Sequence, residues 1–285
     1  MFRYKKKGKM ILQIFPNVSE FYKYVKDTPR RKGARKSSED NDSDFAYTDT
    51  LEEAYNLLLK TDDKLYKNYK NTKKIDINKI LGNRINRKKF KDDIVGFTPN
   101  VPNYIKGIPL NMINEIPKNI SQKCLNIFIN IDVSCFVDTS EMLKVGTLYI
   151  QIIDLLEKSG YRCNVYTGIT VDGNGGEIGV CYFKIKTDRE PFNIKKCIFP
   201  LSNPAMFRRI FFKWIECAEF DNELTHIGYG SPLRDEQRTK EIICKYLKIN
   251  PIVWNFQTMK GISEDKIIEK LEKDYGIKIG DDINW

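Results

Sequence analysis

The strongest constraint on the fold is a run from Leu125 to Val133, rich in Ile and Val, that leads into a long amphipathic segment. Apolar residues recur at helical spacing from Met142 to Leu156, and Gly160 ends that pattern. Tyr161 to Thr170 then has the composition of a second strand. A strand, a long helix and a strand in this order predict parallel pairing through a right-handed crossover.

Helices and strands continue to alternate after this unit. The turn residues Asp172 to Gly176 and the run Gly179 to Lys186 predict a hairpin. Five further elements are expected: a helix over 204–218, a strand over 224–228, a helix over 234–247, a strand over 252–256 and a helix over 263–275. This order predicts an α/β fold with an open sheet flanked by helices.

The first third of the chain is basic and less regular. The formal net charge is +10, and residues 1–100 hold 24 Lys and Arg against 14 Asp and Glu, while the remaining residues hold 24 of each. Thr50 and Glu53 match a capping box at the start of a helix. Adjacent blocks of opposite charge predict a mobile segment over 28–44. The proline-rich stretch 96–118 predicts an irregular segment packed on the following domain.

Three regions are therefore expected. Residues 1–45 form a basic strand, a helix and a mobile loop, residues 46–120 form a helical and irregular region, and residues 121–285 form the α/β domain.

Composition disfavours several classes of protein. No run approaches the roughly 18 uncharged apolar residues of a membrane span, and the N-terminal apolar run is too short for a secretory signal. The seven cysteines lie at wide spacings, as is typical of reduced thiols. His226 is the only histidine, which argues against Cys/His zinc sites and Ser-His-Asp catalysis. A cytoplasmic protein without a membrane partner is expected.

Asp132 and Ser134 follow the first predicted strand of the α/β domain. Ligands collect at the carboxyl ends of strands in open α/β sheets, so these two residues indicate where a binding site would lie. The alternative is that Asp132 caps backbone amides at the turn from strand to helix.

Asp132, Ser134, the long helix and the run Gly160 to Val165 resemble the opening of a von Willebrand factor A domain, whose first strand ends in an Asp-x-Ser-x-Ser metal motif. The resemblance implies a von Willebrand factor A-like open sheet, a function in recognition, and Asp132 and Ser134 as candidate metal ligands. A cation such as Mg²⁺ requires several oxygen ligands, so these two with water would bind it weakly. Phe136 occupies the position of the second serine and has no oxygen to offer. No cofactor is therefore expected, with Mg²⁺ as the alternative.

A second resemblance covers more of the chain. The runs Thr50 to Leu59, Val101 to Met112, Asp132 to Ser134 and Asn203 to Arg209 resemble an uncharacterised family of phage and prophage proteins. This similarity implies a viral genome and the cytoplasm of a host cell, and it supplies no activity.

Arg208 and Arg209 lie near the start of the helix expected over 204–218, where they form a candidate anion-binding patch. The alternative is that the apolar residues beside them are core and the arginines are solvated.

The expected function is that of a non-enzymatic protein-interaction module whose partner is a host or phage protein of unknown identity. The alternative is a nucleic-acid-binding accessory factor that uses the basic N-terminal region. Its phosphate contacts would come from Arg30, Arg31, Lys32, Arg35, Lys36, Arg87, Lys88 and Lys89. A metal-dependent hydrolase centred on Asp132 ranks third, because its ligand set is incomplete.

Overall fold

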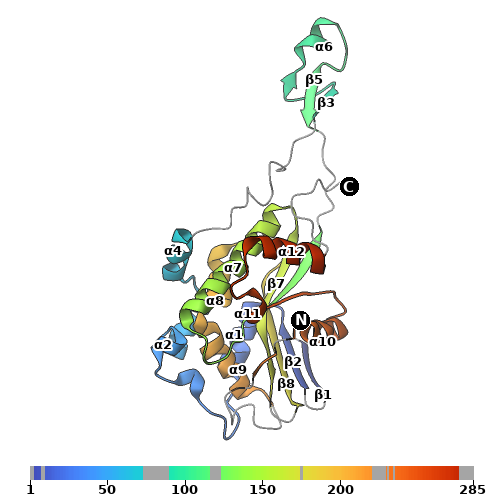
Figure 1. The fold of residues 1–285 in the computed structure, drawn as a ribbon. Helices are drawn as coiled ribbons and strands as arrows, with labels where there is room; N and C mark the ends of the chain where they lie inside the picture. Colours follow the sequence, from blue (N-terminus) through green and yellow to red (C-terminus); the bar gives the residue numbers. More distant parts are fainter. Residues whose placement is uncertain are drawn as a thin grey trace.

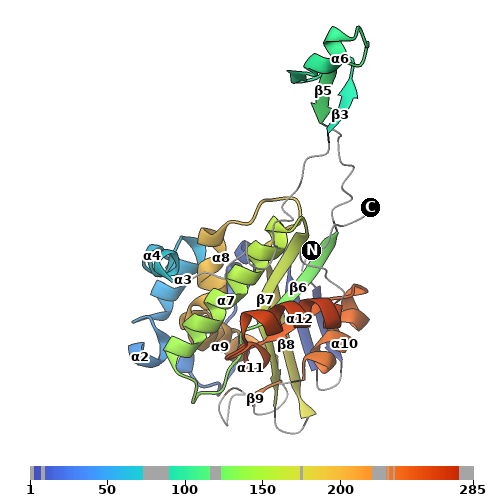
Figure 2. The ribbon, with the colours of Figure 1, turned by 45° about the horizontal axis from the view of Figure 1, so that its top comes forward.

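The computed structural model describes residues 3–7, 10–72, 90–115, 123–173, 176–219, 229, 231–233 and 235–275. These residues form a mixed α/β fold with a central sheet flanked by helices, and a second, three-stranded sheet (Figures 1 and 2).

The central sheet combines parallel and antiparallel pairs. Its strands lie in the order β1 (Arg3–Lys7), β2 (Met10–Phe15), β8 (Ile178–Lys186), β7 (Arg162–Asp172), β6 (Cys124–Asn130) and β10 (Ile252–Asn255), and β9 (Ser231–Pro232) also pairs with β7. Strands β10, β6 and β7 are parallel to one another, and β2 is parallel to β8. The β1–β2, β7–β8 and β7–β9 pairs are antiparallel. The predicted parallel pair and the predicted hairpin are both confirmed.

The apolar side chains of the unit β6–α7–β7 follow the periodicity of a strand in β6 and of a helix in α7. Ile127 and Ile129 of β6 belong to one hydrophobic core and Phe128 to the other, as the period of a strand requires. Helix α7 (Thr139–Lys158) buries its apolar side against the larger core. Gly160 ends the unit's helix with a φ of +93°, a conformation that favours glycine.

Helices cover the two faces of the sheet unequally. The larger core joins the sheet to α1 (Val18–Asp27), α3 (Leu51–Leu59), α4 (Asp63–Asn71), α7, α8 (Ile194–Ser202), the π-helical segment η4 (Met206–Phe211), α9 (Phe212–Cys217), α11 (Phe256–Met259) and α12 (Glu264–Tyr275). The smaller core joins the other face to α10 (Glu236–Leu247) (Figure 2).

Most of the predicted C-terminal elements are confirmed as α10, β10 and α12. The helix expected over 204–218 is divided into η4 and α9, and α8 lies before it in a stretch for which no element was expected. The strand expected over 224–228, and His226 within it, lie outside the described residues. No described helix has the length and apolar character needed to cross a membrane.

The N-terminal elements belong to the same body as the C-terminal half. Strand β2 extends the sheet beyond β8, and the ring of Phe21 in α1 stacks on Phe183 at 4.3 Å and lies 5.3 Å from Phe211. The sequence places these elements in a separate region, 1–45, whereas the structure gives them a common core with residues 124–271. The reason is that β8 exposes an unpaired edge until β2 hydrogen-bonds to it.

A small sheet unit, residues 90–115, contains β3 (Phe90–Asp93), β4 (Thr98–Pro99), the short helix α6 (Val101–Ile105) and β5 (Met112–Glu115), with strand order β3-β5-β4. The expectation of an irregular segment packed on the following domain is wrong for these residues. They form regular strands, and many of their apolar side chains are exposed. Residues 116–118 of the predicted segment lie outside the described residues.

Candidate functional site

The carboxyl end of β6 carries a buried polar network. Asn130, the last residue of β6, accepts a hydrogen bond from the backbone amide of Thr170 at 3.0 Å. The Thr170 hydroxyl lies 3.0 Å from the hydroxyl of Tyr182. Because β6, β7 and β8 are neighbours, these polar groups tie three central strands together beside the predicted Asp132 site.

Asp132 is enclosed, with 2% of its surface exposed. Its Oδ2 atom has no hydrogen-bond partner among the described residues. Burial raises the pKa of this carboxyl well above its usual range, opposed in part by the Asn130 side chain and the backbone amides of Thr170 and Leu233. The Thr170 amide donates to the Asn130 side chain, and the Leu233 amide donates to the Thr170 carbonyl oxygen. Both amides lie near Asp132 but are bonded to other acceptors, and capping of the turn by Asp132 stays a prediction.

Ser134, two residues after Asp132, is partly exposed. Its hydroxyl oxygen accepts the backbone amide of Phe136 at 3.4 Å, and the Phe136 ring is 92% exposed. No group of three or more His, Cys, Asp or Glu residues gathers as a metal site within the described ranges. Both candidate ligands follow β6 in the same loop, but Asp132 is buried and Ser134 is partly exposed.

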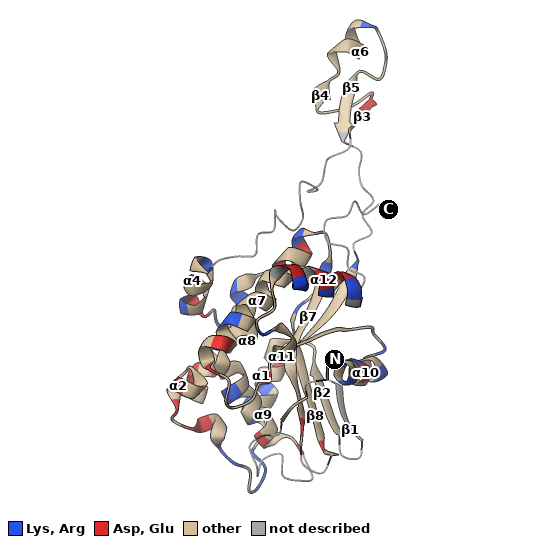
Figure 3. Cartoon of the chain, in the orientation of Figure 1, with Lys and Arg blue, Asp and Glu red and all other residues tan. Residues whose placement is uncertain are grey.

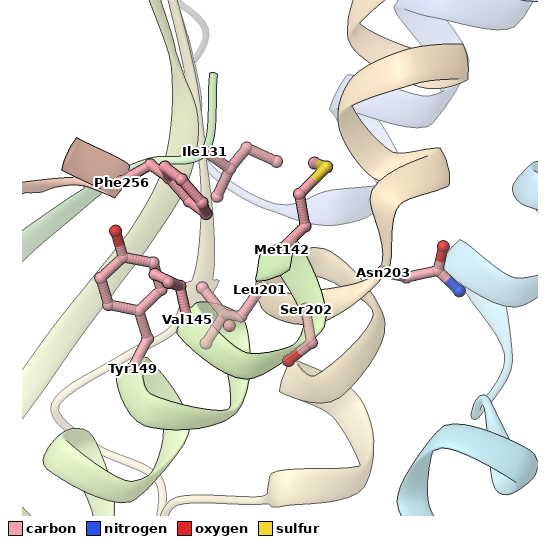
Figure 4. Close-up of a pocket in the computed structure, with 9 residues that line it drawn as sticks. Ile131, Met142, Val145, Tyr149, Leu201, Ser202, Asn203 and Phe256 are labelled. Atoms are coloured by element: carbon pink, nitrogen blue, oxygen red, sulfur yellow. The ribbon is translucent and has the colours of Figure 1, made fainter. Parts of the chain in front are cut away.

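A small cavity lies between the end of β6, α7, α8 and α11 (Figure 4). Tyr149 and Ser202 line it, and the hydroxyl of each is buried without a hydrogen-bond partner among the described residues. Its volume of about 20 Å³ accommodates roughly one water molecule. A Cβ on Gly146 would lie 2.3 Å from the Cα of Ser202, so close packing of α7 on α8 requires glycine there. The cavity is suited to a bound water and is too small for a substrate.

Arg209 is buried, and its guanidinium group binds the segment 38–49. It donates to the carbonyl oxygens of Ser38, Asp40, Thr48 and Asp49 and to the Thr48 hydroxyl, over 2.5–3.2 Å. Only 1% of Arg209 is exposed. Its donors are used inside the protein, so the side chain is neither solvated nor available at an anion-binding surface.

Arg208 is buried in the same way, with 2% exposed. It donates to the carbonyl oxygens of Phe45 and Val137, and its guanidinium carbon lies 3.9 Å from the centroid of the Phe45 ring. The sequence predicted either an anion-binding patch or a solvated pair for Arg208 and Arg209. In the structure, both arginines are buried.

The basic block after α1 is anchored through Glu216, which is fully buried. Arg30 Nε lies 2.5 Å from Glu216 Oε2, and Glu216 also accepts the Ser38 amide at 2.9 Å and the Tyr229 hydroxyl at 2.7 Å. A second carboxylate, that of Glu39, lies 2.5 Å from Arg30 Nη2. Mobility over 28–44 was expected from its adjacent blocks of opposite charge, and these ion pairs and hydrogen bonds are polar anchors that the prediction did not include.

The remaining residues predicted to contact phosphate have different environments. The backbone amide of Arg31 donates to the carbonyl oxygen of Glu216 at 2.9 Å. Lys32, Arg35 and Lys36 are exposed. The other three, Arg87, Lys88 and Lys89, lie outside the described residues. Arg30, whose guanidinium pairs with Glu216 and Glu39, is thus engaged inside the protein, whereas Lys32, Arg35 and Lys36 lie at the surface.

Exposed apolar side chains are concentrated in the small sheet unit. Nine of the eleven large apolar side chains that are exposed within the described residues lie between Phe90 and Leu110. They are Phe90, Ile94, Val95, Phe97, Val101, Tyr104, Ile105, Ile108 and Leu110. Figure 3 shows few charged residues on this unit. We call these nine side chains the apolar surface of the small unit.

Polar contacts hold the backbone of this unit in shape. The Asp92 carboxylate accepts hydrogen bonds from the side-chain amides of Asn100 at 2.8 Å and Asn103 at 3.0 Å. Asn103 also donates to the carbonyl oxygen of Leu110 at 2.9 Å. A Cβ on Gly96 would lie 2.2 Å from the carbonyl oxygen of Ile113, so the close approach of the two segments requires glycine. Polar contacts thus link the segments of the unit, and nine of its large apolar side chains are exposed.

Comparison with known protein families identifies one family that matches this chain. A family model described as "Domain of unknown function (DUF7192)" matches residues 3–278, nearly the whole chain. The chain belongs to this family. The DUF7192 match includes the small sheet unit as well as the central sheet. No curated protein and no solved structure matches the chain.

Sequence reasoning missed Glu216 and the apolar surface of the small unit. Glu216 lies within an apolar helix, and a lone carboxylate in such a helix is a signal that a buried cation is required. The apolar residues from Phe90 to Leu110 were noticed as too apolar for a free linker. Their exposure has no signature in the sequence, because the same residue types also form cores.

Proposed function

We propose that this member of the DUF7192 family binds another protein through the apolar surface of the small unit. The observation that carries the proposal is the concentration of nine exposed apolar side chains in residues 90–110. Single exposed apolar residues are normal on a protein surface, whereas a contiguous group is typical of an interaction site. A non-enzymatic interaction module is the function this arrangement supports best.

The aromatic and branched side chains of this surface fit the chemistry of protein interfaces. Phe97 is 64% exposed, Tyr104 69% and Ile105 77%. Aromatic residues are enriched at the centres of interfaces, where they bury large areas at low cost in side-chain entropy. The partner therefore requires an apolar groove or face of its own, and a folded protein supplies one.

Three finer features accompany the proposal. The order β6, α7, β7 supports a von Willebrand factor A-like sheet. The resemblance to phage proteins supports a viral origin, and a partner in the host cytoplasm is consistent with it. The proposed binding requires no metal, since the apolar surface carries it.

Nucleic-acid binding is the alternative function. Lys32, Arg35 and Lys36 are exposed and carry the local positive charge. Arg30 is paired with Glu216 and Glu39, which removes one cation from the set on which that function was based. We therefore rank it second.

The test compares the wild type with Phe97→Ser/Ile105→Ser in quantitative affinity purification from cells that make the full chain. Both side chains are exposed, so their loss leaves the fold intact. The control is Phe136→Ser, which removes an exposed phenylalanine outside the unit. We expect one protein to co-purify in a fixed ratio with the wild type and the control, and to be lost from the double variant. Equal recovery with all three proteins would refute the proposal.

A further inference from the structure

A surface cleft of about 470 Å³ lies between α1, the segment from η1 (Ser37–Glu39) to Asp49, the start of α3, and α9. Its size is that of small-molecule sites in proteins, which are roughly 300–1,000 Å³. It lies apart from the apolar surface of the small unit, and the proposed function makes no use of it. The charges that line it indicate which ligand it suits.

The innermost charge is Lys213, which lines the cleft from α9 with 8% of its surface exposed. It forms no ion pair with a carboxylate of the described residues. The thiol of Cys217 lies beside it, donates to the carbonyl oxygen of Thr28, and has a pKa raised by burial despite the opposing effect of Lys213. The thiol is therefore neutral, and the positive charge of Lys213 is left without a close partner.

The rim of the cleft has the opposite sign. Glu39, Asp49 and Glu52 line it, with Lys26 as the only rim cation among the described residues. Lys26 is 3.9 Å from Glu52, and Glu39 shares Arg30 with Glu216. Asp49 is exposed, and its carboxylate forms no ion pair with a described residue. The cleft thus has a cation inside it and an anion at its mouth, and neither forms an ion pair with a described residue.

We propose that this cleft binds a small zwitterionic ligand of the amino-acid or short-peptide type. Its carboxylate pairs with Lys213, its ammonium group pairs with Asp49, and the ring of Tyr55 and the side chain of Leu51, which also line the cleft, contact the chain between them. A purely anionic ligand would meet the acidic rim, and a purely cationic one would meet Lys213. Only a ligand with both charges satisfies both groups.

The experiment is calorimetric titration of the full chain with glycine, β-alanine, aminobutanoate, aminopentanoate and aminohexanoate, in which the distance between carboxylate and ammonium increases stepwise. Hexanoate and hexylamine are matched probes with one charge each. We expect one member of the series to bind best, and both single-charge probes to bind at least about tenfold more weakly, since one charge-assisted contact is lost.

Two variants locate the binding. Lys213→Met and Asp49→Asn are each expected to weaken the best ligand by at least about tenfold. Asp49 is exposed, so its substitution tests the proposal even if Lys213→Met fails to fold. Lys245→Met, at an exposed position on α10, is the control and is expected to leave the affinity unchanged. Absence of binding throughout the series, equal binding of hexanoate or hexylamine, or unchanged affinity in Asp49→Asn would overturn the proposal.

Discussion

Asp132 shows how one buried side chain links the sheet to the pH dependence of stability. The pKa of its carboxyl is raised by burial, so the folded state favours the protonated form. The unfolded pKa is about 3.9, and this contribution to stability is present below that value and is lost as the pH rises toward the folded pKa. For each pH unit in that window the loss approaches about 1.4 kcal/mol.

Asp132→Asn is the corresponding prediction, because the amide has a similar shape and does not ionise. The variant is expected to gain free energy of unfolding relative to the wild type as the pH increases from 4 to 8. Urea denaturation at several pH values measures the difference. Parallel stability curves for the two proteins across this range would show that Asp132 is not buried as described.

At the scale of elements, Arg209 of η4 anchors the chain between η1 and α3, which includes the short helix α2 (Ser43–Ala46). It donates hydrogen bonds to Ser38, Asp40, Thr48 and Asp49 in this segment. Short π-helical segments occur frequently at functional sites in proteins. In this protein, η4 contains two adjacent buried arginines, Arg208 and Arg209. The segment's order therefore depends on a residue about 160 positions away in the sequence.

Arg209→Met is expected to accelerate tryptic cleavage at Lys32, Arg35 and Lys36 several-fold, because the segment loses its anchor while the core keeps a side chain of similar length. Cleavage is followed by mass spectrometry under native conditions. The matched control is Arg238→Met on α10, a partly exposed arginine on the other side of the sheet. Equal cleavage rates in the wild type and both variants would contradict the anchoring function of Arg209.

Contacts between residues close in the sequence could be predicted, whereas contacts between distant residues could not. The unit β6–α7–β7 and the Thr50 cap are set by neighbouring residues, and both were predicted. The Thr50 hydroxyl accepts the Glu53 amide at 3.1 Å, although the Glu53 carboxylate binds the Asp49 amide rather than that of Thr50. The pairing of β2 with β8 and the burial of Arg209 depend on partners far along the chain. Backbone carbonyls, which every residue has, leave no sequence signal of such contacts.

The whole molecule combines a large mixed α/β body with a small sheet unit whose exposed side chains are mostly apolar. In the body, the N-terminal strands and α1 complete a core with the C-terminal half, so that residues distant in sequence stabilise one sheet. In the small unit, polar contacts from Asp92 stabilise the backbone while apolar groups face outward. Under the proposed function, the body supplies stability and the unit supplies recognition.

Site-specific photo-crosslinking tests that assignment most directly. A photoreactive amino acid replaces Ile105 in the small unit or, in separate proteins, Leu59 or Phe136, the two large exposed apolar residues outside the unit in the described part of the chain. The account predicts a saturable crosslink from position 105 to one partner protein, competed by unlabelled wild type and not by Phe97→Ser/Ile105→Ser, with none from positions 59 and 136. Crosslinks from position 105 only to the chain itself or to a second copy, or equal crosslinking from all three positions, would contradict it.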